Sequence, residues 1–226
     1  MSKLRIRSES MLGTSHSWAV TMRSLLREFY AMGHDLYLNS TNEYDLFPDE
    51  WRQLCREGVN ADIDITYTLP RNFRYRFNRN SKLKLAIYNY ETSILPAVWA
   101  NDIRYIDYAL PSSNFSKEVF VNVGWPEEKC LVIPHGINLD DFKNKAKVSN
   151  LKTKKKFKFL NVSIPHYRKN IDTLVDAYYS AFTDQDDVCL ILKVTLKEPR
   201  YKFECNVVKQ IVEVQKKHKG KRFPQV

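Results

Sequence analysis

Apolar residues recur along this chain with two alternating periods, one typical of strands and one typical of helices. Alternation over residues 3–7 predicts a strand, and helical spacing over residues 16–32 predicts a long amphipathic helix. Gly33 follows at the position where a left-handed residue often ends a helix. Residues 35–39 predict a second strand, and a right-handed crossover is expected between the two strands.

The alternation of strands and helices continues as far as residue 133. Further strands are predicted at residues 63–68, 83–89, 107–110 and 130–133. A helix is predicted over residues 113–123, with Ser113 as its cap. Strands that alternate with helices predict an α/β fold with a mainly parallel sheet, covered by helices on both faces.

A change of composition divides the chain. Residues 143–156 are rich in lysine, asparagine and serine and nearly free of apolar residues, as in a surface linker. We therefore predict a first domain over residues 1–142, a basic linker over residues 143–156 and a second domain over residues 157–226.

The second domain is predicted to begin a new α/β alternation. Strands are expected at residues 157–162 and 188–194, and helices at residues 170–182 and 203–217. Residues 223–226 resemble the start of a further strand. A sheet of two strands buries little surface, so the second domain is expected to be incomplete.

Composition indicates a folded protein with an anionic partner. The hydrophobic fraction is 43%, and the net charge is +10. The sequence contains no run of about 18 apolar residues and no signal peptide, so a cytoplasmic location is expected, with possible peripheral contact with a membrane. The four cysteines form no CxxC pair and are expected to be reduced thiols.

Residues 71–84 interleave arginines with aromatic side chains. This pattern can stack on nucleic-acid bases or lie at a lipid interface, but a solvated loop that leads into a strand is the simplest interpretation. The charge pattern alone leaves the three interpretations open.

Two loops carry candidate binding residues. Gly13 and Thr14 follow the first predicted strand, where a glycine lets a ligand approach the backbone, although a plain turn explains the same residues. Arg168 and Lys169 precede a predicted helix at the carboxyl end of a strand, where two cations can neutralise a diphosphate. Solvated loop residues are the alternative for this pair.

The histidines do not form a metal-binding pattern. They are dispersed, without an HExxH motif or a pair of carboxylates at metal spacing, so no metal ion or other cofactor is expected. His135 and His166 are expected to be neutral, hydrogen-bonded loop residues.

Five short motifs occur along the chain in a fixed order. They are residues 32–36 (MGHDL), 107–115 (DYALPSSNF), 132–138 (VIPHGIN), 159–163 (FLNVS) and 167–170 (YRKN). In this order and spacing the set resembles the family-4 retaining glycosyltransferases, and the resemblance covers nearly the whole chain. It implies a GT-B fold, in which two Rossmann-like domains with parallel sheets face a cleft, the second domain being incomplete here.

The resemblance also implies a reaction and roles for single residues. A retaining, hexosyltransferase-like enzyme would move a sugar from a nucleotide diphosphate sugar to an acceptor hydroxyl, in glycan biosynthesis. Lys169 takes the position of the family's diphosphate-binding lysine, with Arg168 beside it and Gly13 and Thr14 also on the donor side. Glu91 stands in the context of a glutamate that contacts the acceptor in some members, and a capping or salt-bridged glutamate is the alternative.

Some features depart from the family's pattern. Ser163 and Ile164 replace a common glycine and a phosphate-binding arginine, so the donor contacts are expected to differ. The family's two glutamates eight positions apart are absent from the 226 residues. The resemblance therefore implies a C-terminally truncated chain that is inactive alone.

The expected partners are a nucleotide sugar donor, a glycan or lipid-linked acceptor and an anionic membrane, and no nucleic acid is expected. Another GT-B nucleotide-sugar enzyme, such as an epimerase, is one alternative. A basic nucleic-acid-binding module is the other, although the chain has no helix-turn-helix, zinc-finger or aromatic RNP pattern.

Overall fold

The structure is a computed structural model that describes residues 2–41, 46–56, 58–143, 151–194 and 206–226. The chain divides into two compact units, residues 1–145 and residues 146–226. Most of the predicted linker, residues 144–150, lies outside the described residues.

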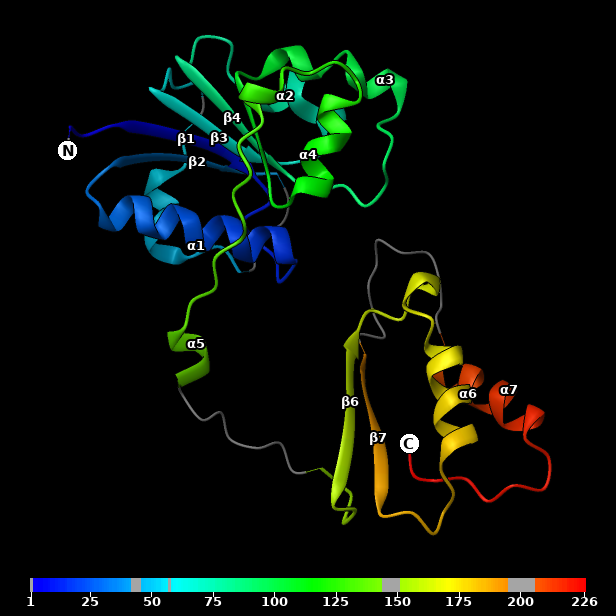
Figure 1. Ribbon diagram of the computed structural model, residues 1–226. Helices are drawn as coiled ribbons and strands as arrows, with labels where there is room; N and C mark the ends of the chain where they lie inside the picture. The colour runs from blue at the N-terminus through cyan, green and yellow to red at the C-terminus, as the bar shows by residue number, and fades with distance from the viewer. Residues whose placement is uncertain (1, 42–45, 57, 144–150, 195–205) are drawn as a thin grey trace. The chain divides into compact units, whose positions relative to one another are not determined.

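The first unit is built on a five-stranded parallel sheet with the strand order β2-β1-β3-β4-β5 (Figure 1). The strands are β1 (Arg5–Ser10), β2 (Asp35–Ser40), β3 (Ile63–Tyr67), β4 (Leu83–Tyr88) and β5 (Tyr108–Pro111). Strand β1 has β2 on one side and β3 to β5 on the other. The chain therefore adds strands in opposite directions from β1, as in a doubly wound sheet.

Helices cover the sheet from both sides. The helices of the first unit are α1 (Ser17–Ala31), α2 (Phe73–Arg76), α3 (Ala97–Ala100), α4 (Asn114–Val121) and α5 (Asp140–Lys143), with 3-10 turns η1 (Asp49–Leu54), η2 (Pro70–Asn72), η3 (Ile103–Tyr105) and η4 (Glu127–Lys129). Ser113 caps α4 by accepting a hydrogen bond from the Ser116 amide, as predicted. Gly33 follows α1 with φ of 87°, so a glycine does end the first long helix.

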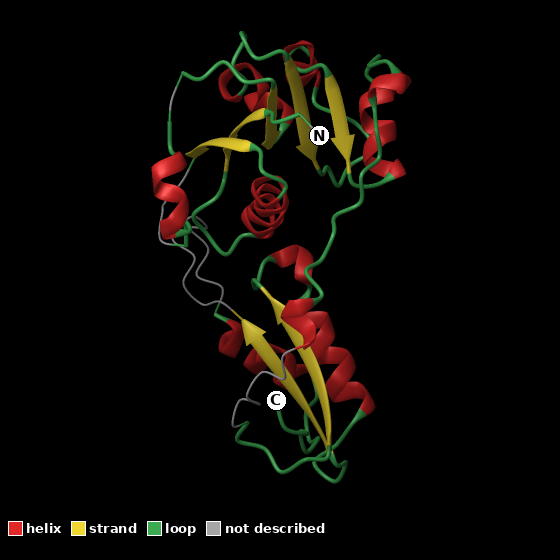
Figure 2. Cartoon of the chain, turned by 90° about the vertical axis from the view of Figure 1, so that its left-hand side faces the viewer, coloured by secondary structure: helices red, strands yellow, loops and turns green. Residues whose placement is uncertain are grey.

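Two hydrophobic clusters hold the first unit together. On one face, Met22 and Leu26 of α1 pack with Ile6 and Leu38 of the sheet. Figure 2 shows α1 end-on beside this face. On the other face, the buried Tyr88 stacks on Phe120 of α4 with ring centroids 4.0 Å apart. The sheet is therefore covered on both faces, as the strand–helix alternation predicted.

The second unit pairs β6 (Phe157–Ser163) in parallel with β7 (Val188–Val194). Helices α6 (Ile171–Ala181) and α7 (Val207–Lys217) pack on this sheet through a cluster that includes Val175, Leu190 and Val214. Gln225 forms a parallel bridge with Cys189 of β7, where the sequence predicted the start of a further strand. The last helix was predicted over residues 203–217, and its first three residues lie outside the described residues.

The structure corrects two predicted boundaries. Residues 130–133 do not form a regular strand, because only Cys130 makes a bridge, to Ala109 of β5. Strand β1 continues to Ser10 instead of ending at Arg7, because Ser8 and Ser10 are buried and their hydroxyls lie 3.0 Å apart. The three cysteines in the described parts of the chain are free thiols.

Candidate functional site

The carboxyl ends of the parallel strands in the first unit bring together side chains from four distant segments. Tyr67 ends β3, Asn89 directly follows β4 and Ser112 directly follows β5. His135 reaches Tyr67 and Asn89 from the irregular segment after η4. Open α/β sheets bind ligands at this edge, so these four residues, the carboxyl-edge cluster, are the core of the candidate site.

Hydrogen bonds join the cluster. The Tyr67 hydroxyl and the Asn89 amide nitrogen each lie 3.1 Å from Nε2 of His135. The Ser112 hydroxyl donates to the amide oxygen of Asn89. Because the amide nitrogen can only donate, Nε2 accepts and the proton of the neutral imidazole is on Nδ1.

Burial sets the charge of the cluster. It lowers the pKa of His135, which favours the neutral imidazole that the sequence predicted. Burial raises the pKa of the Tyr67 hydroxyl, and the negative charge of Glu91 raises it further. The cluster is therefore uncharged near neutral pH, and its hydroxyl and amide groups suit hydrogen bonding to polar, uncharged parts of a ligand.

An aromatic wall stands beside the cluster at the start of α1. The Trp18 ring stacks on Tyr67 with centroids 4.8 Å apart and an interplanar angle of 17°. His16 meets Trp18 edge-on at 5.4 Å and caps α1 by accepting a hydrogen bond from the Trp18 amide. The start of α1 is thus fixed against the carboxyl end of β3.

The loop with Gly13 and Thr14 lies at the same edge, after β1, and is held in place by α1. Gly13 is buried, and the hydroxyl of the half-buried Thr14 accepts a hydrogen bond from the His16 amide at 3.3 Å. Arg23 of α1 donates to the carbonyls of Leu12 at 2.6 Å and Thr14 at 2.8 Å. These backbone contacts give the loop one defined shape.

Glu91 is an exposed residue of the segment between β4 and α3. Its charge raises the pKa of the Tyr67 hydroxyl, so the carboxylate lies within electrostatic reach of the carboxyl-edge cluster. The structure therefore brings Glu91 to the same edge as Gly13 and Thr14.

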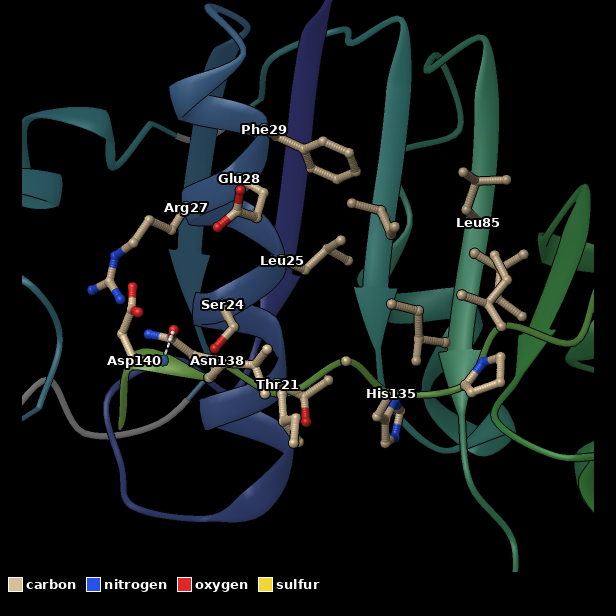
Figure 3. Close-up of a pocket in the computed structure, with 18 of the residues that line it drawn as sticks. Thr21, Ser24, Leu25, Arg27, Glu28, Phe29, Leu85, His135, Asn138 and Asp140 are labelled. Atoms are coloured by element: carbon tan, nitrogen blue, oxygen red, sulfur yellow. Dashed lines mark hydrogen bonds between the residues drawn. The ribbon is translucent and has the colours of Figure 1, made fainter. Parts of the chain in front are cut away.

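A cavity of about 680 Å³ adjoins the cluster between α1 and the sheet (Figure 3). Its apolar lining comes from α1, from β3 to β5 and from the segment that follows η4, and includes Leu25, Phe29, Ile65, Leu85, Ile87 and Leu110. His135 lines it as well. The volume is within the range of about 300 to 1,000 Å³ that is usual for small-molecule sites.

In the second unit, Arg168 and Lys169 lie on an exposed loop between two regular elements. They belong to the 3-10 turn η5 (Tyr167–Lys169), which follows β6 and precedes α6. Asn170 turns the chain into α6 with a left-handed conformation, φ of 51° and ψ of 48°. Among the described residues, no ion pair involves the Lys169 ammonium. A helix start and two cations together suit an anion.

Within the described ranges, no group of three or more His, Cys, Asp or Glu side chains is placed to hold a metal ion. In the same ranges, no helix has the length and apolar character needed to cross a membrane.

No sequence pattern pointed to Tyr67, Ser112 or Arg23 as residues of a site. Tyr67 and Ser112 could have been found from their positions, because they stand at or just after the carboxyl ends of predicted strands. Arg23 gave no signal, since an arginine on an amphipathic helix is usually a solvent-facing residue.

No protein-family model matches the chain, and none of the curated proteins matches it. Solved structures do resemble it. The apo form of WaaB, a lipopolysaccharide outer core galactosyltransferase, is 13% identical with a TM-score of 0.52, over 84% of this chain and 60% of WaaB. HepE from Anabaena, in complex with UDP, is 15% identical with a TM-score of 0.55, over 95% of this chain and 67% of HepE.

Both of these structures are GT-B glycosyltransferases, so the predicted GT-B fold is confirmed. The chain spans about 60% of the length of WaaB and 67% of that of HepE.

Proposed function

We propose that this GT-B chain belongs to a retaining, hexosyltransferase-like glycosyltransferase, which moves a sugar from a nucleotide diphosphate sugar to an acceptor hydroxyl. The observation that carries the proposal is the Arg168–Lys169 loop before α6, on a fold similar to that of the UDP-bound HepE. Two cations at the start of a helix fit the diphosphate of such a donor.

In the proposed reaction, the bond between the anomeric carbon and the diphosphate oxygen breaks. The acceptor oxygen forms the new bond to that carbon on the face that the diphosphate leaves, and its proton passes to the departing diphosphate. Negative charge grows on the leaving diphosphate, and Lys169 and Arg168 would stabilise it most at that point. The reaction as proposed uses no metal ion or other cofactor.

The proposal assigns the first unit to the acceptor side. Glu91 would contact the acceptor next to the uncharged carboxyl-edge cluster, while Gly13 and Thr14 would border the donor. A neutral, hydrogen-bonding surface suits the hydroxyl groups of a glycan or of the head of a lipid-linked acceptor. Peripheral contact with an anionic membrane is part of the proposal, and a nucleic-acid partner is not.

Under this proposal, these 226 residues bind the nucleotide of the donor but do not transfer its sugar. Their sequence has no pair of glutamates eight positions apart, the motif that holds the donor sugar and the ribose in the family that the chain resembles. Transfer needs a donor that is held and oriented, beyond the grip on its phosphates.

Calorimetric titration of the chain with UDP tests the donor site. We expect Lys169→Ala to weaken UDP binding by roughly ten- to a hundredfold, because a hydrogen bond to a charged group contributes about 1.5 to 3 kcal/mol. Stability should hardly change, because Lys169 is exposed.

Lys154→Ala is the matched control, because it removes the same charge from an exposed position of the second unit. Lys155 would be a poor control, since its ammonium donates to the carbonyls of Asp184 and Asp186. Equal losses in the two variants would show general electrostatic attraction. An unchanged affinity for Lys169→Ala would remove Lys169 from the donor site.

A further inference from the structure

Two segments of the first unit run side by side across the sheet face that carries α4. Three arginines of residues 70–79 each contact a residue of residues 99–105. Arg71 lies over the Trp99 ring at 5.5 Å, Arg74 bonds the Asp102 carboxylate at 2.6 Å and Arg79 lies over the Tyr105 ring at 5.9 Å. The contacts follow the same order along both segments, so the segments form one continuous surface.

This surface carries a large share of the positive charge. Residues 70–79 and 94–105 contain five arginines and one acidic residue, a net charge of +4. The acid, Asp102, is buried and bonded to Arg74, and Arg76 is paired with Glu9 of β1. Arg71, Arg79 and Arg104 are exposed, so the outward charge is positive.

Large apolar side chains are exposed on the same elements. Ile94, Val98 and Tyr75 are 75%, 73% and 70% exposed. Their neighbours Leu95 and Phe73 are the residues that these segments bury in the core. Ile94, Val98 and Tyr75 are therefore not needed for packing within the first unit. Three exposed apolar side chains among arginines indicate a surface that meets a partner.

We propose that this surface, formed by η2, the loop before α3, α2, α3 and η3, docks on an anionic lipid bilayer. Ile94 and Val98 would enter the boundary between headgroups and acyl chains, while the exposed arginines contact lipid phosphates. The pairing of Trp99 with Arg71 also suits the interface, where tryptophan is enriched. Aliphatic side chains favour a bilayer over a nucleic acid, because they do not stack on bases as aromatic rings do.

Docking would place the candidate site next to the membrane. Ile94 follows Glu91 by three residues on the segment between β4 and α3, and Asn89 of the carboxyl-edge cluster begins that segment. A lipid-linked acceptor could then present its headgroup to Glu91 while its chains stay in the bilayer. The docking surface and this consequence for the acceptor both extend the proposed function, but neither depends on the donor site at Lys169.

Vesicle sedimentation with the whole chain tests the docking. We expect binding to vesicles of equal parts phosphatidylglycerol and phosphatidylcholine, weaker binding as salt rises, and little binding to phosphatidylcholine alone. Arg71→Gln with Arg104→Gln should weaken binding by about 25-fold, since each arginine near an anionic surface contributes about fivefold. Ile94→Ser with Val98→Ser should weaken it by about tenfold.

Arg74 is left unchanged, because its loss would leave the buried Asp102 carboxylate without its partner. Lys152→Gln with Lys154→Gln is the control, because it removes two charges from exposed positions of the second unit. Circular dichroism checks that each variant is folded, and the two independent pairs of substitutions keep the test open if one pair misfolds.

An equal loss in the control would overturn the proposal, as would absent vesicle binding or preferential binding of duplex nucleic acid. UDP titration of the same variants separates the two proposals. Retained UDP binding with lost vesicle binding supports the docking surface, and vesicle binding without UDP binding would refute only the proposed donor site.

Discussion

Nε2 of His135 lies within hydrogen-bond distance of two groups at the ends of different strands, the Tyr67 hydroxyl and the Asn89 amide. Ser112 orients Asn89 by donating to its amide oxygen. The Asn89 amide favours the neutral imidazole, because its nitrogen can only donate and a protonated Nε2 could accept no hydrogen bond. The first unit therefore offers uncharged hydrogen-bonding groups at this edge of its sheet.

This arrangement predicts the titration of His135. Its pKa should lie below the ordinary value for histidine, and Asn89→Ala should raise it by removing a donor to the neutral ring. Nuclear magnetic resonance titration of the imidazole C–H signals measures both values. Asn101→Ala, at an exposed position, should leave the pKa unchanged. A pKa at or above the ordinary value in the unsubstituted chain would contradict the prediction.

A second titration prediction concerns Asp64, a fully buried residue of β3. Arg7 donates to its carboxylate at 2.8 Å and the Asn78 amide at 2.7 Å, yet burial dominates and raises its pKa to about 6. Between about pH 4 and pH 6 the folded chain then binds this proton more tightly than the unfolded chain does. The contribution of Asp64 to the free energy of unfolding should therefore fall as the pH rises through this window.

Asp64→Asn removes the titrating group, so the comparison of the two proteins isolates it. The variant should lack this fall, which is at most about 1.4 kcal/mol per pH unit. Urea unfolding at several pH values measures it. Parallel pH profiles of the two proteins would show that the folded and unfolded chains hold the Asp64 proton equally.

Among the elements, those with a long periodic pattern could be predicted well. The amphipathic spacing of α1, the glycine after it and the serine cap of α4 each depend on neighbouring residues only. Strand β1 was predicted too short, because Ser8 and Ser10 look like turn residues in sequence. Both hydroxyls find partners inside the fold, and Ser10 also accepts from the Tyr67 amide at 3.1 Å.

The carboxyl-edge cluster could be predicted only in part. Tyr67 and His135 are 68 positions apart and meet because β3 and the segment after η4 end at one edge, which depends on strand order. The positions of Arg168 and Lys169 could be predicted, since the strand, loop and helix around them are consecutive. The roles of these two residues stay predictions.

Arg23 gives a test of how α1 fixes the Gly13 loop. Its guanidinium donates to the carbonyls of Leu12 and Thr14. Arg23→Ala should cost about 1 to 3 kcal/mol of unfolding free energy, because a buried carbonyl loses its partner. Hydrogen exchange of the loop amides should accelerate, and UDP binding should weaken if the loop borders the donor.

Arg27→Ala is the control for Arg23→Ala, because Arg27 is an exposed arginine one turn further along α1. Equal effects of the two substitutions on unfolding would show that the loss of helix charge, and not the loss of the loop contacts, is responsible.

At the scale of the whole molecule, the two units have separate cores. The two clusters of the first unit come from five strands and from helices on both faces, whereas a single cluster joins β6, β7, α6 and α7. In β6, the apolar side chains of Phe157, Leu160 and Val162 are more than half exposed. The second unit thus buries less of its apolar surface. Burial of apolar surface is the main source of the stability of a folded unit.

We therefore expect the second unit of this chain to unfold at a lower urea concentration than the first. Hydrogen exchange followed by mass spectrometry across a urea series reports on each unit separately. Peptides from β6 and α6 should lose protection while those from β3 and β4 remain protected. The slope of stability against urea scales with the surface exposed on unfolding. The first unit is larger, so its transition, which comes later in the urea series, should also be steeper. Loss of protection in all four elements at one urea concentration would show that the two units unfold together, and that contacts between them contribute to stability.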